Sequence, residues 1–79
     1  MYLLTKETYN SKGKLTDSDA VGLFSSWDAV SNKMRTIAQS YSHRNCDVIP
    51  GRGNDVYISF NDGLQREFHF VAQQIEVEA

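Results

Sequence analysis

The residues of this sequence whose types and spacing could do chemistry gather first around its single cysteine. His43 precedes Cys46 by three positions, and Asp47 follows it directly. An imidazole, a thiol and a carboxylate so close together could bind zinc or form a nucleophile with its base. A structural zinc site requires four ligands, however, and His69 is the only other imidazole in the chain. The motif therefore favours a lone buried or half-exposed thiol, and we expect no metal and no cofactor.

A second motif is the glycine-flanked arginine of Gly51-Arg52-Gly53-Asn54. Such a loop can present its guanidinium group to a phosphate or a carboxylate. It lacks the GK[ST] ending and the following helix of a phosphate-binding loop. The motif favours a surface loop, and among the loops it is where we first expect a binding contact.

The pattern assembles no nucleophile, base and oxyanion donor together, so we do not expect an enzyme. We expect binding by polar and aromatic side chains that lie outside the core. Phe68 and Phe70 flank His69, so on an alternating strand His69 points away from the core and towards solvent. Tyr57 alternates with apolar neighbours in the same way. The candidate partner-binding residues are Arg44, Arg52, Asn54, Tyr57 and His69.

Length and composition limit the context in which these residues act. The chain of 79 residues has room for one domain, residues 1–79. A single cysteine excludes an intramolecular disulfide and favours a reducing compartment. The apolar run at the N-terminus is too short for a signal peptide or a membrane span. We therefore expect a soluble, cytoplasmic protein without membrane contact.

The charge balance bears on the class of partner. The chain carries 8 basic and 10 acidic residues, for a formal net charge of −2. Nucleic-acid binders usually carry a basic excess on one face, so we expect a protein or protein complex as the partner, and nucleic acid is disfavoured. A homodimer is the other association that we consider, because a chain this short has a small core and gains stability from dimerisation.

One amphipathic helix is the clearest long-range pattern. Apolar residues recur with a 3.6-residue period from Trp27 to Tyr41, and the opposite side is polar. Ser25 or Ser26 can cap the N-terminus, and Asp28 suits the positive end of the helix dipole. His43 and Arg44 lie at the other end, where positive charge is favourable. We predict a helix over residues 26–42.

Alternating runs predict the strands. Residues 2–9 form the first, and Asn10-Ser11-Lys12-Gly13 after it is a turn signal, because glycine can take a positive φ. A second strand is best defined at residues 20–24, after a loop or distorted strand at 16–19. Residues 46–55 read as a loop, with a short strand conceivable at 47–49. The runs 55–60 and 64–70 flank Asp62-Gly63, a strong hairpin signal because a type I′ turn requires positive φ at both central residues.

The last strand contains a change of phase. Leu64, Phe68 and Phe70 have even positions, whereas Val71, Ile75 and Val77 have odd positions. A period-2 strand cannot bury both sets on one face. We expect either a β-bulge between Val71 and Gln74 or a tail that leaves the sheet and buries its apolar residues elsewhere, for example in a subunit contact.

These elements predict an α+β fold in the order β-β-α-β-β. It is a two-layer sandwich in which one amphipathic helix packs on an antiparallel sheet of about four strands. The predicted core consists of large apolar side chains on the helix stripe and on the inward strand positions. They are Leu4, Val21, Leu23, Trp27, Val30, Met34, Ile37, Tyr41, Val56, Ile58, Phe60, Phe68 and Phe70.

The layout resembles a group of small phage-encoded accessory proteins. The matching stretches are a first strand and glycine turn at residues 2–13, an LFSSW-type entry into the helix at 23–29, and a closing strand at 68–78. Together they cover about half of the chain and carry no catalytic residues. The resemblance implies a viral protein, and proteins of this kind include inhibitors of bacterial defence such as anti-CRISPR proteins, which act by binding.

Two hypotheses from different classes follow. The first is a non-enzymatic phage-type accessory protein that binds and inhibits or redirects a host macromolecule, such as a component of a bacterial defence system. The alternative is a self-associating structural or small-ligand-binding module of phage origin, whose tail, Val71 to Val77, pairs across a two-fold axis. Direct nucleic-acid binding through Arg44 and Arg52 would show steep salt dependence, and we rank it third.

Overall fold

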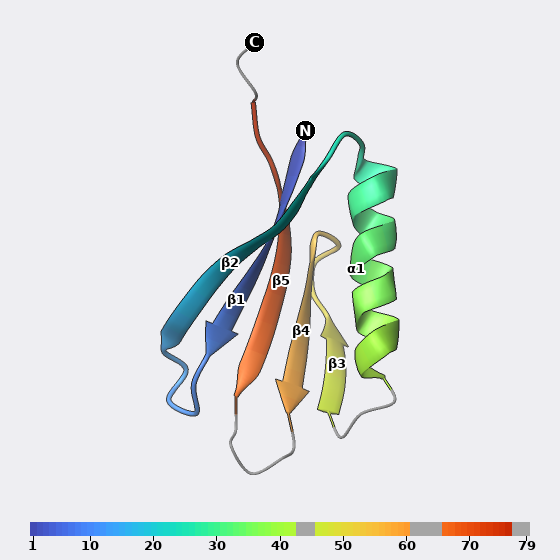
Figure 1. The fold of residues 1–79 in the computed structure, drawn as a ribbon. Coiled ribbons are helices and arrows are strands. Elements are labelled where there is room, and N and C mark those ends of the chain that lie inside the picture. The colour runs from blue at the N-terminus through green and yellow to red at the C-terminus, as the bar shows by residue number, and fades with distance from the viewer. Residues whose placement is uncertain (43–45, 61–65, 77–79) are drawn as a thin grey trace.

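The fold of the chain is one antiparallel sheet with a single helix beside it, seen in a computed structural model that describes residues 1–42, 46–60 and 66–76 (Figure 1). The elements in chain order are β1 Tyr2–Tyr9, β2 Leu15–Phe24, α1 Trp27–Tyr41, β3 Cys46–Pro50, β4 Asp55–Phe60 and β5 Glu67–Gln74. The five strands lie in the order β2-β1-β5-β4-β3, so the last strand of the sequence occupies the centre of the sheet.

The predicted β-β-α-β-β order with four strands is wrong. The chain order is β-β-α-β-β-β, the sheet has five strands, and the protein is mainly β with one helix. The additional strand is β3, which pairs with β4 from Cys46 opposite Phe60 to Pro50 opposite Val56. Its own residues give a poor strand signal, because it is short and ends in a proline. An edge strand tolerates proline, which has no N–H to donate, so pairing with β4 rather than local propensity defines it.

The first hairpin joins β1 to β2 through the predicted turn. Gly13 has φ +75°, and the Asn10 side chain accepts hydrogen bonds from the backbone N–H groups of Lys12 and Lys14. The strand β2 is longer than predicted, because the region read as loop or distorted strand belongs to it. Its register with β1 shifts twice, leaving Thr16 and Val21 as extra residues in two bulges. The bulges explain why the sequence of β2 does not alternate cleanly.

The helix agrees with its prediction to within one residue at each end. Ser26 is the N-cap, and its hydroxyl accepts a hydrogen bond from the Ala29 N–H at 3.2 Å. Asp28 lies in the first turn. The helix ends at a cap on Ser42, whose backbone N–H bonds to carbonyls of the last turn. The expected contribution of His43 and Arg44 to this end lies outside the described residues.

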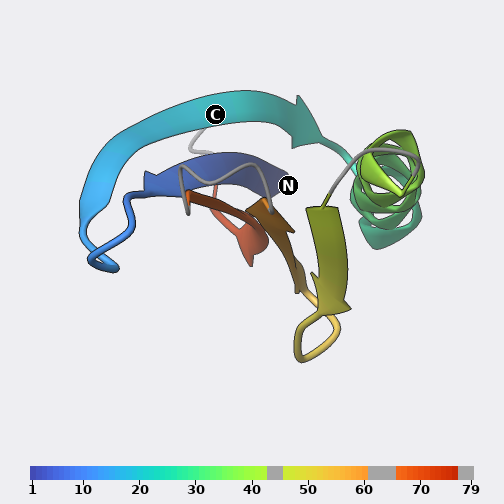
Figure 2. The ribbon, with the colours of Figure 1, turned by 90° about the horizontal axis from the view of Figure 1, so that it is seen from below.

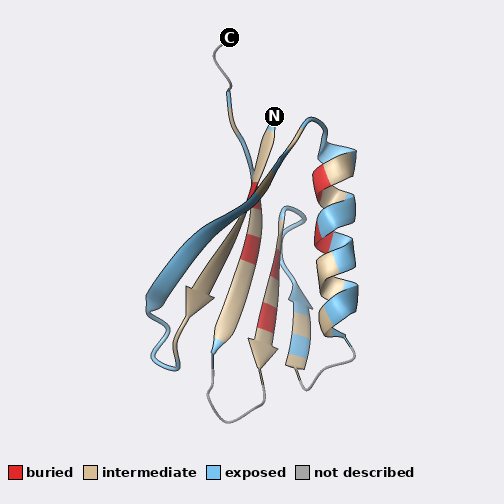
Figure 3. Ribbon diagram, in the orientation of Figure 1, coloured by how far each residue is buried: buried red, intermediate tan, exposed pale blue. Residues whose placement is uncertain are grey.

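The core lies between the helix and one face of the sheet, which we call the inner face. Even-numbered residues of β1, β4 and β5 point to this face, and the helix contributes two buried side chains. The buried positions lie on the sheet and on α1 (Figure 3). The buried residues are Leu4, Val30, Met34, Val56, Ile58, Phe70 and Ala72. Four other predicted core residues, Ile37, Tyr41, Phe60 and Phe68, are half-buried against this cluster.

Three predicted core residues are exposed: Val21, Leu23 and Trp27. Leu23 pairs with Leu3 on the opposite face of the sheet, and Val21 sits in a bulge, so neither points at the helix. Trp27 begins the helix and packs edge-on against Tyr2 at a centroid distance of 5.7 Å without being covered.

The phase change in the last strand does not produce a bulge. The strand β5 pairs with β1 in unbroken register from Glu67 to Gln74. The small Ala72 continues the buried even-numbered set, and Val71 lies half-buried on the other face. A bulge between Val71 and Gln74 is therefore excluded. Ile75 still bonds to Met1 through its backbone, while Val77 lies outside the described residues.

The antiparallel pairing of β4 with β5 is as predicted, but the Asp62-Gly63 turn and the predicted start of the strand at Leu64 lie outside the described residues. The sheet is strongly curved, and the helix lies along one side of it (Figure 2). The face away from the helix, the outer face, is covered by no other element among the described residues. None of the helical segments in the described part of the chain has the length and apolarity to cross a bilayer.

Candidate functional site

The outer face carries an ordered set of polar and aromatic side chains at the centre of the sheet. The cross-strand register places Glu7, His69 and Tyr57 in one row across β1, β5 and β4. Two residues further along each strand, Tyr9 and Glu67 stand side by side in a second row, which ends at Ser59 of β4. Because alternate residues of a strand point to the same face, both rows project away from the helix. We call these two rows, with Asp55, the outer-face site.

His69 lies at the centre of this site between two carboxylates. Its Nδ1 is 3.0 Å from Oε1 of Glu7, and its Nε2 is 2.9 Å from Oδ2 of Asp55. A neutral imidazole has one N–H, whereas the imidazolium donates from both nitrogens. Both contacts are therefore hydrogen bonds at once in the charged form, which makes a Glu7–His69–Asp55 chain across three strands. The sequence predicted correctly that His69 points away from the core, but its side chain is only 14% exposed.

Asp55 is fixed by the loop between β3 and β4. The backbone N–H of Arg52 donates to Oδ1 of Asp55 at 2.8 Å, and the N–H of Gly51 donates to the Asp55 carbonyl. A Cβ on Gly51 would collide with the Asp55 carboxylate, so the loop can close around this side chain only with glycine there. The hydrogen bond from His69, followed by that from Arg52, lowers the pKa of Asp55 below 3.8 against the opposing effect of burial.

Tyr57 provides the aromatic wall of the site. Its ring stacks on the imidazole of His69, with centroids 4.1 Å apart and an interplanar angle of 3°. Parallel stacking of this kind is a favourable arrangement of two aromatic rings. The stack and the two carboxylates together fix the imidazole on three sides.

Tyr9 reports the electrostatic character of the neighbouring row. Burial raises the pKa of its phenol first, and the charge of Glu7, the neighbouring Tyr57, a hydrogen bond to Glu7 and the charge of Glu67 raise it further. These neighbours all disfavour a phenolate. The carboxylates of Glu7 and Glu67 therefore act on the Tyr9 phenol in the same direction as burial.

A hollow of about 600 Å³ opens on the outer face beside these rows. Its walls come from the end of β1 and the following turn on one side and from β4 and β5 on the other. Among its lining residues are Glu7, Tyr9, Tyr57, Arg66, Glu67 and His69. It is an open hollow rather than an enclosed cavity, and it has room for a side chain of a partner.

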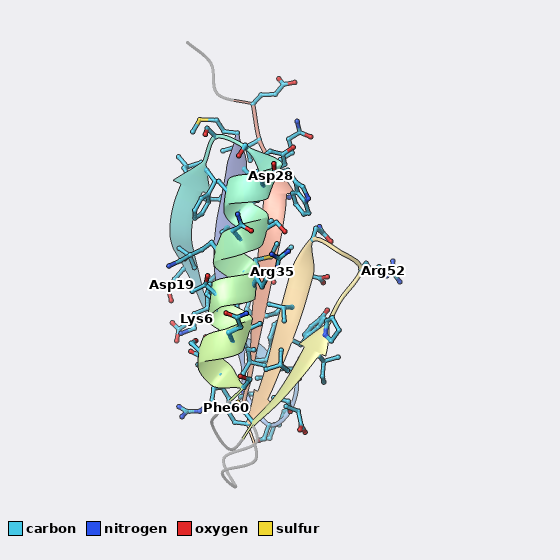
Figure 4. All side chains as sticks on the ribbon, turned by 90° about the vertical axis from the view of Figure 1, so that its right-hand side faces the viewer. Lys6, Asp19, Asp28, Arg35, Arg52 and Phe60 are labelled. Atoms are coloured by element: carbon cyan, nitrogen blue, oxygen red, sulfur yellow. The ribbon has the colours of Figure 1, made fainter. Side chains whose placement is uncertain are left out.

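The structure brings together only some of the predicted partner-binding residues. Tyr57 and His69 are in direct contact. Arg52 contributes its backbone to Asp55, but its side chain points away from the body of the protein at the tip of the loop (Figure 4). Asn54 bonds instead to Ala72, through its side-chain amide and its carbonyl. Arg44 lies outside the described residues.

Sequence reasoning missed four residues of the site: Glu7, Tyr9, Asp55 and Glu67. The alternation of the first strand already placed Glu7 and Tyr9 on a common face opposite Leu4. Their proximity to His69 follows from the pairing of β1 with β5, in which Tyr9 lies opposite Glu67, 58 positions later in the chain. No local signal marks that pairing.

Cys46, the single cysteine of the sequence, lies away from this site on the inner face. Its Sγ is 2.9 Å from the carbonyl oxygen of Tyr41, to which the thiol donates. The side chain is half-buried, in agreement with the expected thiol. Within residues 1–42, 46–60 and 66–76, no group of three or more histidine, cysteine, aspartate or glutamate side chains is arranged to hold a metal ion.

Comparisons with known proteins add no relative to this description. No family model matches the chain, and neither the curated proteins nor the solved structures include a match.

Proposed function

We propose that this protein is a non-enzymatic binding protein that inhibits or redirects a macromolecule of a bacterial host, and that it does so with its outer face. The observation that carries the proposal is the Glu7–His69–Asp55 chain with Tyr57 stacked on it, on a sheet face that no described element covers. Aromatic and charged groups held rigidly before binding lose little conformational entropy on association. Such a surface is suited to recognition of a protein.

The same geometry favours binding over catalysis. Both ring nitrogens of His69 face carboxylates at hydrogen-bond distance. A general base needs a free nitrogen directed at the proton that it removes. The imidazole of His69 thus holds the site together. Its neighbours Tyr57 and Glu67 offer contact surface to a partner rather than a nucleophilic group.

Affinity capture tests the proposal, with variants that separate the two faces of the molecule. A tagged wild-type protein is incubated with bacterial lysate beside Ser59→Arg, which places a bulky charge on the outer face. The matched control is Gln39→Arg, on the exposed side of α1. We expect a specific partner with the wild type and the control, and its loss with Ser59→Arg while thermal melting stays unchanged. Capture that is equal for both variants, or absent throughout, would contradict the proposal.

Self-association is a second candidate, and it has its own supporting observation. Exposed apolar side chains gather near the end where β1 begins and β2 ends: Met1, Val21, Leu23 and Trp27 are 44%, 38%, 54% and 39% exposed. The accessible surface is 5471 Å², against about 4,900 Å² for a compact chain of this mass. A second copy on this end would bury apolar surface.

The mode of dimerisation expected from the sequence needs correction. Residues 71–74 pair with β1 inside the sheet, so this part of the tail is not a free edge for a two-fold contact. The dimer now proposed instead uses the apolar end, and Leu23→Ser should abolish it. Sedimentation velocity that shows a monomer at high concentration for the wild type would remove this candidate.

A further inference from the structure

We propose that the hollow on the outer face receives an arginine side chain of the partner protein, with Glu67 as its carboxylate acceptor and the rings of Tyr9 and Tyr57 as its aromatic walls. This inference rests on the proposed function and specifies the partner's chemistry.

The carboxylate of Glu67 is the acidic group of the site that makes no contact with His69. Glu7 and Asp55 both bond to His69, so their charges face the imidazole. In the described part of the chain, no hydrogen bond or ion pair engages the Glu67 carboxylate. Glu67 is nevertheless half-buried, and it lines the hollow. A partly desolvated carboxylate of this kind gains strongly from a charged donor.

The electrostatics of the hollow select a cation. Three carboxylates, those of Glu7, Asp55 and Glu67, lie in or beside the hollow, and the charges of Glu7 and Glu67 add to the effect of burial in raising the pKa of Tyr9. Arg66 also lines the hollow, but its guanidinium carbon lies 5.0 Å from the centre of the Phe60 ring. An anionic partner such as a nucleic acid would place its phosphates against Glu67, which opposes binding.

The walls favour arginine over lysine. Tyr9 stands beside Glu67 in the second row, and Tyr57 lies diagonally across from it. A planar guanidinium can stack on a tyrosine ring while donating two parallel hydrogen bonds to a carboxylate. An ammonium group is a point charge and is more strongly hydrated, so it would exploit the same walls less well.

An NMR titration of the ¹⁵N-labelled protein tests this inference with the capped peptide Ac-Gly-Arg-Gly-NH2. We expect saturable shifts of the amides of Tyr9, Tyr57 and Glu67, with a dissociation constant on the order of millimolar. The lysine peptide should bind more weakly, and the glutamine peptide should cause no saturable shift. Glu67→Gln should weaken the arginine peptide about tenfold, whereas Asp28→Asn on the helix should not change it.

Each contrary outcome identifies what has failed. Equal shifts with the glutamine peptide, unchanged affinity in a well-dispersed Glu67→Gln spectrum, or shifts caused instead by a single-stranded oligonucleotide would overturn the arginine inference. If a partner is captured through the outer face but the peptide does not bind, only this inference fails. If the peptide binds as expected and no partner is captured, the proposed host target fails and the arginine site stands.

Discussion

At the scale of single residues, Asp55 connects the loop of the β3–β4 hairpin to the outer face. It accepts hydrogen bonds from the His69 ring and the Arg52 backbone, and its side chain is only 14% exposed. A carboxylate held by charge-assisted bonds in such a position stabilises the fold while it is ionised. The position is thus structural as well as part of the site.

Acid should remove this contribution. Because the pKa of Asp55 is lowered in the fold, the unfolded chain binds more protons in the range between the folded value and 3.8. The stabilisation is present above about pH 4 and is lost as the pH falls through the folded value. Asp55→Asn should cost about 1–3 kcal/mol of unfolding free energy at pH 7, and its difference from the wild type should shrink below pH 4.

Urea denaturation at several pH values measures this difference. Asp17→Asn is the matched control, because Asp17 is exposed on β2, and it should change stability by less than about 0.5 kcal/mol. A gap between wild type and Asp55→Asn that is constant from pH 7 to pH 2 would rule out the assigned role of the carboxylate.

His69→Phe isolates the hydrogen bonds of the imidazole from its stacking. The phenyl ring can keep the contact with Tyr57, but Glu7 and Asp55 lose their shared donor. We expect a loss of about 2–4 kcal/mol in unfolding free energy, since Glu7 and Asp55 each lose the ring nitrogen that faces them while they stay half-buried. In an Asp55→Asn background the same change should cost less.

The control for this substitution is Tyr57→Phe, which retains the stacked ring and should stay within about 0.5 kcal/mol of the wild type. Equal costs of His69→Phe in both backgrounds, in a double-mutant cycle from urea denaturation, would show that the two side chains do not interact.

At the scale of elements, both edges of the sheet carry features that oppose pairing with another sheet. The edge strand β2 has two bulges and the charges of Asp17 and Asp19, and β3 is short and ends in Pro50. Bulges, charges and proline are the means by which proteins protect sheet edges. A partner is therefore expected on the outer face or the apolar end rather than along an edge.

Gly51 of the β3–β4 loop lies against the Asp55 carboxylate. Gly51→Ala would place a Cβ against the Asp55 carboxylate, so the loop or the carboxylate must move. We expect a loss of about 1–3 kcal/mol in unfolding free energy and altered amide shifts at His69. Gly22→Ala is the matched control, since a Cβ there meets only the Phe24 ring at 3.4 Å.

The Asp55→Ala background makes the test of the loop specific. Without the carboxylate the collision disappears, and Gly51→Ala should then cost less than in the wild type. Thermal or urea unfolding measures this cost. If Gly51→Ala costs as much in the Asp55→Ala background as in the wild type, the requirement for glycine does not come from the Asp55 carboxylate.

At the scale of the whole molecule, the protein is long and thin, with extents of 46 × 24 × 18 Å. Its fully buried apolar set is small, and Leu4, Val30 and Ile58 are its largest members without exposure. A chain of this length has a net stability of about 4–12 kcal/mol. Single core positions therefore account for a large share of the whole.

Ile58 and Ile49 form a matched pair that tests how much a single core position contributes to the stability. Ile58 is fully buried in the centre of the core, whereas Ile49 is 49% exposed on an edge strand. Ile58→Ala should cost about 3–5 kcal/mol and Ile49→Ala less than about 1 kcal/mol. Urea unfolding measures both, and similar costs at the two positions would contradict the assigned core.

Local sequence information was sufficient for the elements whose signals are local. The helix period with its Ser26 cap, the turn at Gly13, and the alternation of the first strand each depend on residues within a few positions of one another. The same reasoning gave β3 only as an optional short strand at 47–49 within a loop, because its strand character comes from its pairing with β4. It failed for Leu23 and Val21, because the bulges in β2 change which face each residue occupies.

The sequence by itself determined that one amphipathic helix covers one face of an antiparallel sheet and that His69 turns away from that helix. Only the tertiary structure decided what His69 meets there. The placement of β5 between β1 and β4 brings Glu7 and Asp55 to the two sides of one imidazole. Alternation within a strand fixes a side chain's face, whereas its neighbours on that face depend on which strands pair, and that choice is made by burial of the whole sheet.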